Sequence, residues 1–150
     1  MDQAATAEQG SPLLQDQLCF ALYAASRAVT ARYRPLLEEL GLTYPQYLVM
    51  LALWDRDSVS VRELGAALQL ESSTLSPLLK RLEAGGLIHR ERRADDERSI
   101  AVRLTRAGSD LREQARTVPA AIGEAMGLTP EQDATAKHLL RLLTANVTHG

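Results

Sequence analysis

The chain has 150 residues, of which 45% are apolar, 4% aromatic and 24% charged, and its formal net charge is −2. This length allows one domain with a core that needs neither disulfides nor metals, and the apolar fraction excludes a disordered chain. The single cysteine, Cys19, excludes an intrachain disulfide and metal clusters built on several cysteines. The longest apolar runs are too short to cross a bilayer and no basic region precedes a signal core, so we expect a cytoplasmic protein.

The first part of the chain predicts a tail followed by a long helix. Residues 1–12 are small and polar and show no period, so we expect a flexible N-terminal tail. Apolar residues recur at helical spacing from Leu13 to Tyr33. Pro35 predicts a kink or the restart of a helix, and Gly41 predicts its end.

Two pairs of polar residues have the spacing of a helix-starting capping box. Thr43 and Gln46 predict a helix that continues through the apolar stretch ending at Trp54, and a turn should follow it. Ser60 and Glu63 repeat the spacing and predict a second, short helix.

The next helix is expected to start with Ser72 or Ser73 as its N-cap and to end at the pair Gly85 and Gly86. Leucines at the positions i, i+3, i+4 and i+7 predict one buried face. These leucines are Leu75, Leu78, Leu79 and Leu82. The opposite face and its flanks carry small, hydroxylic and basic side chains.

The hydropathy period then changes from 3.6 to 2. Residues 87–93 predict a strand, 94–98 a polar loop and 100–104 a second strand, which together form a hairpin with a charged tip. Another helix should open at Thr105 or Ser109. Pro119 and either Gly123 or Gly127 are expected to interrupt the chain after it. Thr129 and Pro130 predict the start of a last helix, which carries an apolar stripe of leucines.

The charges are segregated along the chain. The segment 80–106 holds eight basic and five acidic residues, a local charge of +3, so the rest of the chain carries −5. Two short helices joined by a tight turn and followed by a hairpin are typical of a winged helix-turn-helix. The positive segment coincides with this motif. The negative net charge of the whole chain therefore does not oppose binding to double-stranded operator DNA.

In that reading the second short helix enters the major groove, where small polar side chains reach base edges or phosphates. Arg98, at the hairpin tip, would enter a narrow minor groove, with Asp96 bracing its guanidinium. Each feature alone is also explained by a helix cap, a solvated face or a surface ion pair, and their order favours DNA. The candidate DNA-binding residues are Ser72, Ser73, Thr74, Ser76, Pro77, Lys80, Arg81, Arg92, Asp96 and Arg98.

The fold class predicted is mainly α with a small β-hairpin wing. Long apolar-striped helices at both ends have no partner in so small a core, so we expect them to build a two-fold homodimer. After the tail, 13–150 should form a single domain. Its parts are N-terminal helices with the cysteine (13–58), the winged helix-turn-helix (59–106) and dimerisation helices (107–150).

Three stretches of the chain also carry a family resemblance. The hairpin run DERSIAVRLT (96–105) and the preceding SSTLSPLLKRLEAGGLIHR (72–90) resemble the wing and recognition helix of MarR-family regulators. The runs LCFALYAASR (18–27) and GLTYPQYLVMLALW (41–54) resemble the OhrR subgroup, whose members are repressors that respond to organic hydroperoxides. Because no second, resolving cysteine is present, the resemblance is to the one-cysteine type.

A lone cysteine at an apolar helical position is often inert, but peroxide chemistry needs a thiolate, and a thiolate needs donors around it. Tyr23 lies one turn from Cys19, and Tyr33 and Tyr44 add phenolic donors if the fold brings them near. The resemblance to OhrR implies that Tyr33 and Tyr44 act from the partner subunit. It also implies that a hydroperoxide oxidises Cys19 to a sulfenic acid, which releases the promoter of a peroxide-resistance gene.

Two other functions fit the same residues. One is a MarR-type regulator that senses a phenolic or other small ligand, with Cys19 merely structural. The other is a one-cysteine thiol peroxidase, although no resolving thiol for turnover exists in the chain. We expect no enzyme activity and no cofactor or metal, because the three histidines lack metal-ligand spacing. Oxidised Cys19 is expected either to form a mixed disulfide with a low-molecular-weight thiol or to be overoxidised, and no membrane partner is expected.

Overall fold

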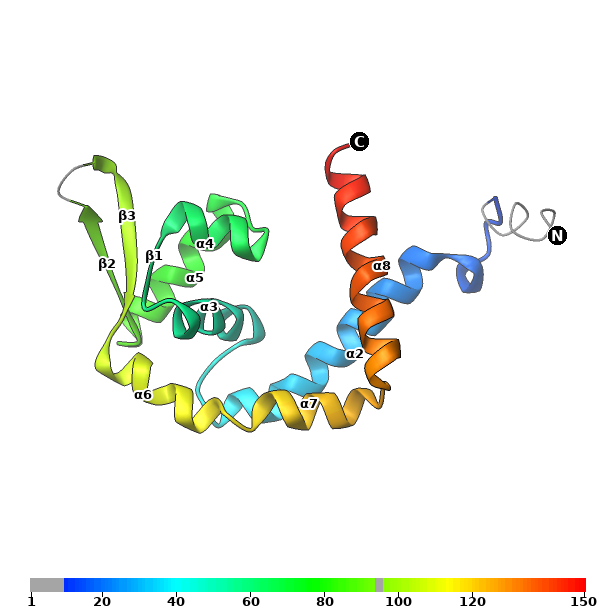
Figure 1. The fold of residues 1–150 in the computed structure, drawn as a ribbon, viewed down its shortest axis with the longest axis horizontal. Helices are drawn as coiled ribbons and strands as arrows, with labels where there is room; N and C mark the ends of the chain where they lie inside the picture. The colour runs from blue at the N-terminus through cyan, green and yellow to red at the C-terminus, as the bar shows by residue number, and fades with distance from the viewer. Residues whose placement is uncertain (1–9, 94–95) are drawn as a thin grey trace. The chain divides into compact units, whose positions relative to one another are not determined.

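A computed structural model describes the backbone of residues 10–93 and 96–150, and their side chains outside 93–98. Eleven elements follow one another along the described chain (Figure 1). They are η1 (Leu14–Asp16), α2 (Leu18–Glu38), α3 (Tyr44–Asp55), β1 (Ser58–Ser60), α4 (Val61–Leu68), α5 (Ser72–Ala84), β2 (Ile88–Arg93), β3 (Asp96–Leu104), α6 (Arg106–Ala115), α7 (Val118–Met126) and α8 (Pro130–Thr148). The chain divides into two compact units, one up to Val118 and one from Pro119 onward.

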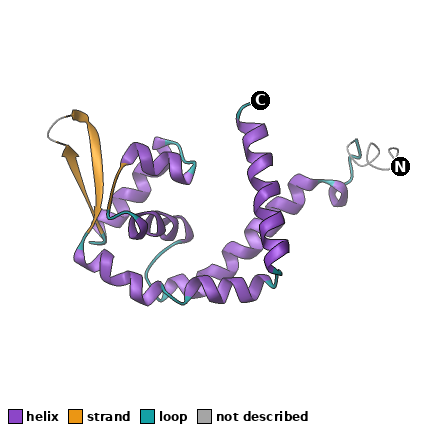
Figure 2. Ribbon diagram, in the orientation of Figure 1, coloured by secondary structure: helices purple, strands orange, loops and turns teal. Residues whose placement is uncertain are grey.

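The fold is the predicted one: mainly helical, with a small antiparallel sheet that forms the wing (Figure 2). The sheet has three strands in the order β1-β3-β2. β1 was not predicted from the sequence. It pairs Val59 with Val102 and is too short for an alternating pattern to reveal it. A bulge lies between Arg92 and Arg93 of β2.

The first long helix differs from its prediction at its start and at Pro35. It begins at Leu18 rather than Leu13, after the short turn η1, and it runs through Pro35 without a restart. Pro35 lies in the last turn of α2, so its missing N–H removes only one bond of the helical ladder. Gly41 ends the helix as predicted, with φ +70° and a hydrogen bond from the Leu42 amide to the Leu37 carbonyl.

Four helix starts confirm the capping predictions. Thr43 and Thr129 form complete capping boxes, and the side chains of Ser60 and Thr105 accept hydrogen bonds from the backbone three residues later. The N-cap of α5 was predicted wrongly. It is Glu71, in an extended conformation, so Ser72 and Ser73 already belong to the first helical turn.

Two interruptions predicted from the sequence are also wrong. β3 starts at Asp96, so the expected loop 94–98 is shorter than predicted, and 94–95 lie outside the described residues. Pro119 does not break a helix, because it lies in the first turn of α7, and Gly123, one of the two alternative glycines, also lies inside α7. A proline is tolerated in the first helical turn, where its missing N–H would have no partner. Gly127, with φ +62°, follows the end of α7 at Met126.

The core of the first unit is built around α3, a helix that is apolar on every side. Five of its residues are buried: Tyr47, Val49, Met50, Leu53 and Trp54. The Trp54 indole donates a hydrogen bond of 2.9 Å to the carbonyl of Gly108 on α6. A Cβ added to Gly108 would overlap the Leu87 carbonyl, so the backbones of α6 and the wing approach too closely for any side chain there.

Candidate DNA-binding surface and thiol site

The helix α5 is held by one leucine face. Leu75, Leu79 and Leu82 are at most 2% exposed, and Leu78 is half-buried. The turn before α5 brings the Leu70 amide to 2.9 Å from the Gly65 carbonyl of α4, and Gln69 adopts a left-handed conformation with φ 55°. The pair α4 and α5 therefore forms a tight helix-turn-helix whose second helix has one fixed outward face.

The structure places all the predicted residues of α5 on its exposed surface. None of them lies on the leucine face, and both ends of the helix contribute, with serines and a threonine near its start and two basic side chains near its end. They are Ser72, Ser73, Thr74, Ser76, Pro77, Lys80 and Arg81. A continuous surface of small and basic side chains can approach a nucleic acid backbone closely.

The wing consists of β2 and β3, whose antiparallel pairing runs from Ile88 opposite Leu104 to Arg93 opposite Asp96, with a register shift between Arg92 and Arg93. Arg92 is exposed and stands opposite Ile100. The backbone of Asp96 and Arg98 belongs to β3, near the end of the hairpin, and their side chains lie outside the described residues. The predicted brace between these two side chains therefore stays a prediction.

An ion pair that was not predicted from the sequence joins the wing to α5. The Glu83 carboxylate accepts hydrogen bonds from the Arg90 amide at 2.9 Å and from two guanidinium nitrogens at 3.0 and 3.3 Å. These hydrogen bonds from Arg90 hold the pKa of Glu83 below its usual value. The available signal was an acidic residue in the last turn of a helix, where the helix dipole disfavours it.

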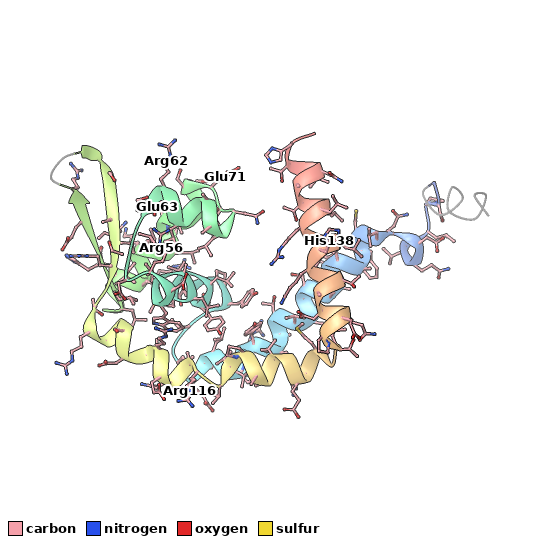
Figure 3. All side chains as sticks on the ribbon, in the orientation of Figure 1. Arg56, Arg62, Glu63, Glu71, Arg116 and His138 are labelled. Atoms are coloured by element: carbon pink, nitrogen blue, oxygen red, sulfur yellow. The ribbon has the colours of Figure 1, made fainter. Side chains whose placement is uncertain are left out.

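A second basic group lies at the start of the helix-turn-helix. Arg56 contacts Glu63 at 3.7 Å, and the Glu63 carboxylate also lies 3.1 Å from the Ser60 hydroxyl (Figure 3). Arg62, at the start of α4, is exposed (Figure 3). Neither arginine was among the predicted site residues, because this stretch was interpreted only as the start of a helix.

The thiol of Cys19 is exposed in the second position of α2. Its neighbours are apolar and also exposed: Leu18 is 65% and Phe20 41% exposed. Tyr23, one turn away, is 59% exposed, and its ring lies 5.5 Å from the Arg27 guanidinium carbon. In a single chain the cysteine therefore lies in an exposed apolar stretch of α2 and outside the core.

Tyr33 and Tyr44 do come together, and a third tyrosine joins them. The ring centroids of Tyr33 and Tyr44 are 4.6 Å apart, and Tyr47 lies 5.7 Å from Tyr33. Burial raises the pKa of Tyr33, and the neighbouring Tyr44 and Tyr47 raise it further. Such a phenol keeps its proton at neutral pH and can donate a hydrogen bond. Tyr47 was not among the site residues predicted from the sequence.

One chain does not bring this tyrosine cluster to its own cysteine. Cys19 and Tyr33 stand fourteen residues apart on the same uninterrupted helix. At 1.5 Å per residue their backbones are about 21 Å apart, several times the reach of a hydrogen bond. Tyr44 lies beside Tyr33 and is excluded for the same reason. Within a single chain, Tyr23 is the only one of the three predicted tyrosines near the thiol.

Comparison with known proteins identifies the family. Residues 31–114 match the profile of the SarA/Rot transcriptional regulators. Over 126 residues the chain is 46% identical to the organic hydroperoxide resistance transcriptional regulator of Bacillus subtilis, and the match covers 84% of each protein. The chain belongs to the MarR family, in its OhrR subgroup. It is a transcriptional regulator of the MarR/SarA type with one cysteine.

Solved MarR-family structures share the fold. The chain resembles AbfR of Staphylococcus epidermidis, which has been solved bound to DNA in two forms. The overoxidized form matches with a TM-score of 0.75 and 35% identity over 97% of this chain and 98% of that one. The reduced form matches with a TM-score of 0.73 and 36% identity over 89% and 93%. Among the described residues of this regulator, none of the helices combines the length and hydropathy that a membrane crossing requires.

Proposed function

We propose that this regulator is a DNA-binding repressor that senses organic hydroperoxides through its single thiol and releases the promoter of a peroxide-resistance gene. The observation that carries the proposal is an exposed cysteine in an apolar stretch of α2, in a chain 46% identical to an organic hydroperoxide resistance regulator. Such a stretch attracts the apolar part of an organic hydroperoxide.

The DNA-binding part of the proposal rests on α5 and the wing. The exposed hydroxyl groups of α5 would face base edges in the major groove, and Lys80 and Arg81 would contact phosphates. Two copies related by a two-fold axis would place their α5 helices one DNA turn apart, about 34 Å. The relative AbfR, solved bound to DNA, supports this mode of binding.

The sensing part requires two copies of the chain. A thiolate is stabilised by hydrogen-bond donors, and one chain offers Cys19 only Tyr23. The Tyr33 and Tyr44 of a second copy would complete the site, with Tyr33 donating as a neutral phenol. The exposed apolar residues that flank Cys19 supply a surface on which a second copy can pack.

The proposed chemistry has two steps. The Cys19 thiolate attacks the terminal oxygen of the hydroperoxide, the O–O bond breaks, and the alkoxide takes up a proton and leaves as an alcohol, so the sulfur becomes a sulfenic acid. A low-molecular-weight thiol then attacks that sulfur and water leaves, which produces a mixed disulfide. Because overoxidized AbfR has been solved bound to DNA, we take the bulkier mixed disulfide as the form that releases DNA here.

The variant Cys19→Ser tests the sensor. It should bind promoter DNA with wild-type affinity and stay bound when cumene hydroperoxide and a small thiol are added, whereas wild type should dissociate. Footprinting of reduced and treated protein measures both states. Release of Cys19→Ser at the wild-type dose would contradict the sensor and favour a regulator of the ligand-binding kind. Many turnovers of peroxide per chain, without DNA binding, would favour a peroxidase.

The variant Arg98→Ala tests the wing. It should weaken specific binding and reduce the slope of log affinity against log salt by about one unit, because one charged contact to DNA is lost. Arg112→Ala on α6 removes the same charge from an exposed position outside the wing and should leave the slope unchanged. Equal slopes for Arg98→Ala and wild type would remove the wing from the proposed interface.

A further inference from the structure

The link between α5 and β2 is short and held at three points. Gly86, with φ +75°, ends α5, and the Leu87 amide donates to the Leu82 carbonyl at 3.1 Å. The Thr105 hydroxyl donates to the Gly86 carbonyl at 2.6 Å. The third point is the Glu83 carboxylate, which accepts from Arg90 on β2. The recognition helix and the wing are therefore tied at their common base.

The Glu83 carboxylate performs two tasks at that base. β2 is an edge strand, and the Arg90 amide faces away from β3 and donates to Glu83 at 2.9 Å. An edge strand normally presents such amides unpaired to solvent. The Arg90 guanidinium lies beside the same carboxylate, and the two side chains are only 28% and 34% exposed. This pairing of one carboxylate with a backbone amide and a guanidinium sets both the position and the direction of the strand.

The pair also reduces the number of positive charges that the segment 80–106 can offer to DNA. Arg90 counts among its eight basic residues, but its charge is neutralised by Glu83 at 3.0 Å. Lys80, Arg81 and Arg92 remain on the exposed surface of α5 and the wing. Arg90 is thus placed to hold the wing and is poorly placed to meet a phosphate.

We propose that Glu83 and Arg90 are positioning residues for DNA recognition: they hold the wing at the angle from α5 at which the helix and the wing reach adjacent grooves of one duplex. Neither side chain contacts DNA in this arrangement. This role rests on the proposed DNA-binding function. It assigns to Glu83 and Arg90 the link between α5 and the wing, the two parts proposed to contact DNA.

A charge argument separates this role from a direct contact. If Arg90 bound a phosphate, Glu83→Gln would free the guanidinium and remove a negative charge, so DNA affinity would rise. If the pair positions the wing, Glu83→Gln and Arg90→Gln both loosen the same link, so both lower affinity. In that case the double variant is no worse than either single one, because each change already breaks the link.

The experiment compares wild type with Glu83→Gln, Arg90→Gln and the double variant. The probe is a duplex selected by the wild-type protein from a random-sequence pool, with an unselected duplex of the same length as reference. Glu113→Gln is the matched control for Glu83→Gln, because it breaks an exposed 3.0 Å ion pair between Glu113 and Arg116, the C-cap of α6, and changes the net charge equally. Thermal unfolding verifies that each variant is folded.

We expect each single variant, and equally the double variant, to lose about tenfold in affinity for the selected duplex. The wild-type wing should protect the DNA minor groove from hydroxyl radicals, and this protection should be lost in the variants. Their affinity for the unselected duplex should equal that of wild type. Glu113→Gln should behave as wild type. Unchanged or higher affinity of Glu83→Gln, or additive losses in the double variant, would overturn the positioning role.

Amide hydrogen exchange in β2 of the free protein supplies a readout without DNA. Exchange should be faster in Glu83→Gln and Arg90→Gln than in wild type and Glu113→Gln, because the strand loses its anchor on α5. Equal exchange rates would show that the pair does not hold the wing. If wild type selects no duplex, the proposed function itself fails, and the exchange rates then decide only whether the pair anchors the strand.

Discussion

The helices α5 and α8 both carry leucines at spacings of three and four residues, yet they use them in opposite ways. On α5, Leu75, Leu79 and Leu82 are between 1% and 2% exposed. On α8, no residue is buried, and Leu139 and Leu140 are 56% and 45% exposed. Helical spacing of leucines thus predicts an apolar face in both cases, and on α5 this face packs into the core of its own compact unit.

The same contrast separates the two regions linked to function. The winged segment is complete within one chain, since its core, its sheet and the Glu83–Arg90 pair are all intramolecular. The proposed thiol site is not complete within one chain, because Cys19 and the Tyr33–Tyr44 pair lie far apart on it. A regulator built this way would fold its DNA-binding part alone and assemble its sensor only in a two-chain complex.

The largest effect is expected where the winged segment is packed most tightly. Gly108→Ala should lower the free energy of unfolding by about 3 kcal/mol or more, because the new Cβ meets the Leu87 backbone carbonyl, which cannot rotate away. Urea unfolding measures the change. Gly123→Ala is the control: its site on α7 has open space and should be neutral or slightly stabilising. Equal stability of both variants would show that the wing base is loosely packed.

The next effect concerns the exposed leucines of α8. Leu140→Glu should leave the unfolding of the winged segment unchanged but raise the dissociation constant of the proposed homodimer at least about tenfold, since a two-fold interface contains the change twice. Sedimentation velocity over a concentration series measures it. Asn146→Glu places the same charge at an exposed polar position of α8 and should assemble normally. Normal assembly of Leu140→Glu would place the interface elsewhere.

A smaller effect is expected in the thiol chemistry. Tyr33→Phe and Tyr44→Phe should each slow the oxidation of Cys19 by roughly tenfold, because a donor to the thiolate is lost and the thiol pKa rises. DNA affinity should stay close to normal. The rate of thiol alkylation against pH measures the change. When they are combined with Leu140→Glu, the two tyrosine substitutions should not change the oxidation rate of Cys19 at concentrations where the protein is monomeric. A persistent effect there would contradict a site shared between chains.

The smallest effect is a pH dependence within the winged segment. The folded-state pKa of Glu83 lies below its usual value, so the unfolded chain binds its proton at a higher pH than the folded chain does. The stabilisation is therefore complete above the usual glutamate pKa and is lost as the pH falls through the lowered one. Glu83→Gln should reduce the loss of stability between neutral pH and pH 3, measured by urea unfolding, relative to Glu113→Gln. If both variants lost the same stability between neutral pH and pH 3, the Glu83–Arg90 pair would not contribute to the acid sensitivity of the fold.

Local signals in the sequence predicted most of the secondary structure correctly. The caps at Thr43, Ser60, Thr105 and Thr129 work through bonds made within four residues, so their spacing is sufficient. Two features that the sequence did not reveal have non-local causes. β1 exists because three residues pair with β3 more than forty positions away, and the pairing of Glu83 with Arg90 depends on how β2 returns along α5.

The candidate site shows the same division. Residue type and helical spacing determined which face of α5 is small, polar and basic, and the exposed surface agrees with that prediction. The roles of those residues in DNA binding stay predictions, as do those of Asp96 and Arg98, whose side chains lie outside the described residues. Sequence could not tell whether Cys19 was buried, because burial depends on which elements pack against α2.

The amino-acid sequence by itself determined the winged-helix class, the ends of most helices and the presence of one thiol, because these follow from local bonding and composition. Only the tertiary structure decided that Tyr33, Tyr44 and Tyr47 form one cluster, that this cluster is far from its own cysteine, and that Glu83 holds Arg90. The physical reason is that a hydrogen bond or an aromatic contact requires a few ångströms between groups that the chain separates by many residues, and only the packing of helices and strands sets that distance.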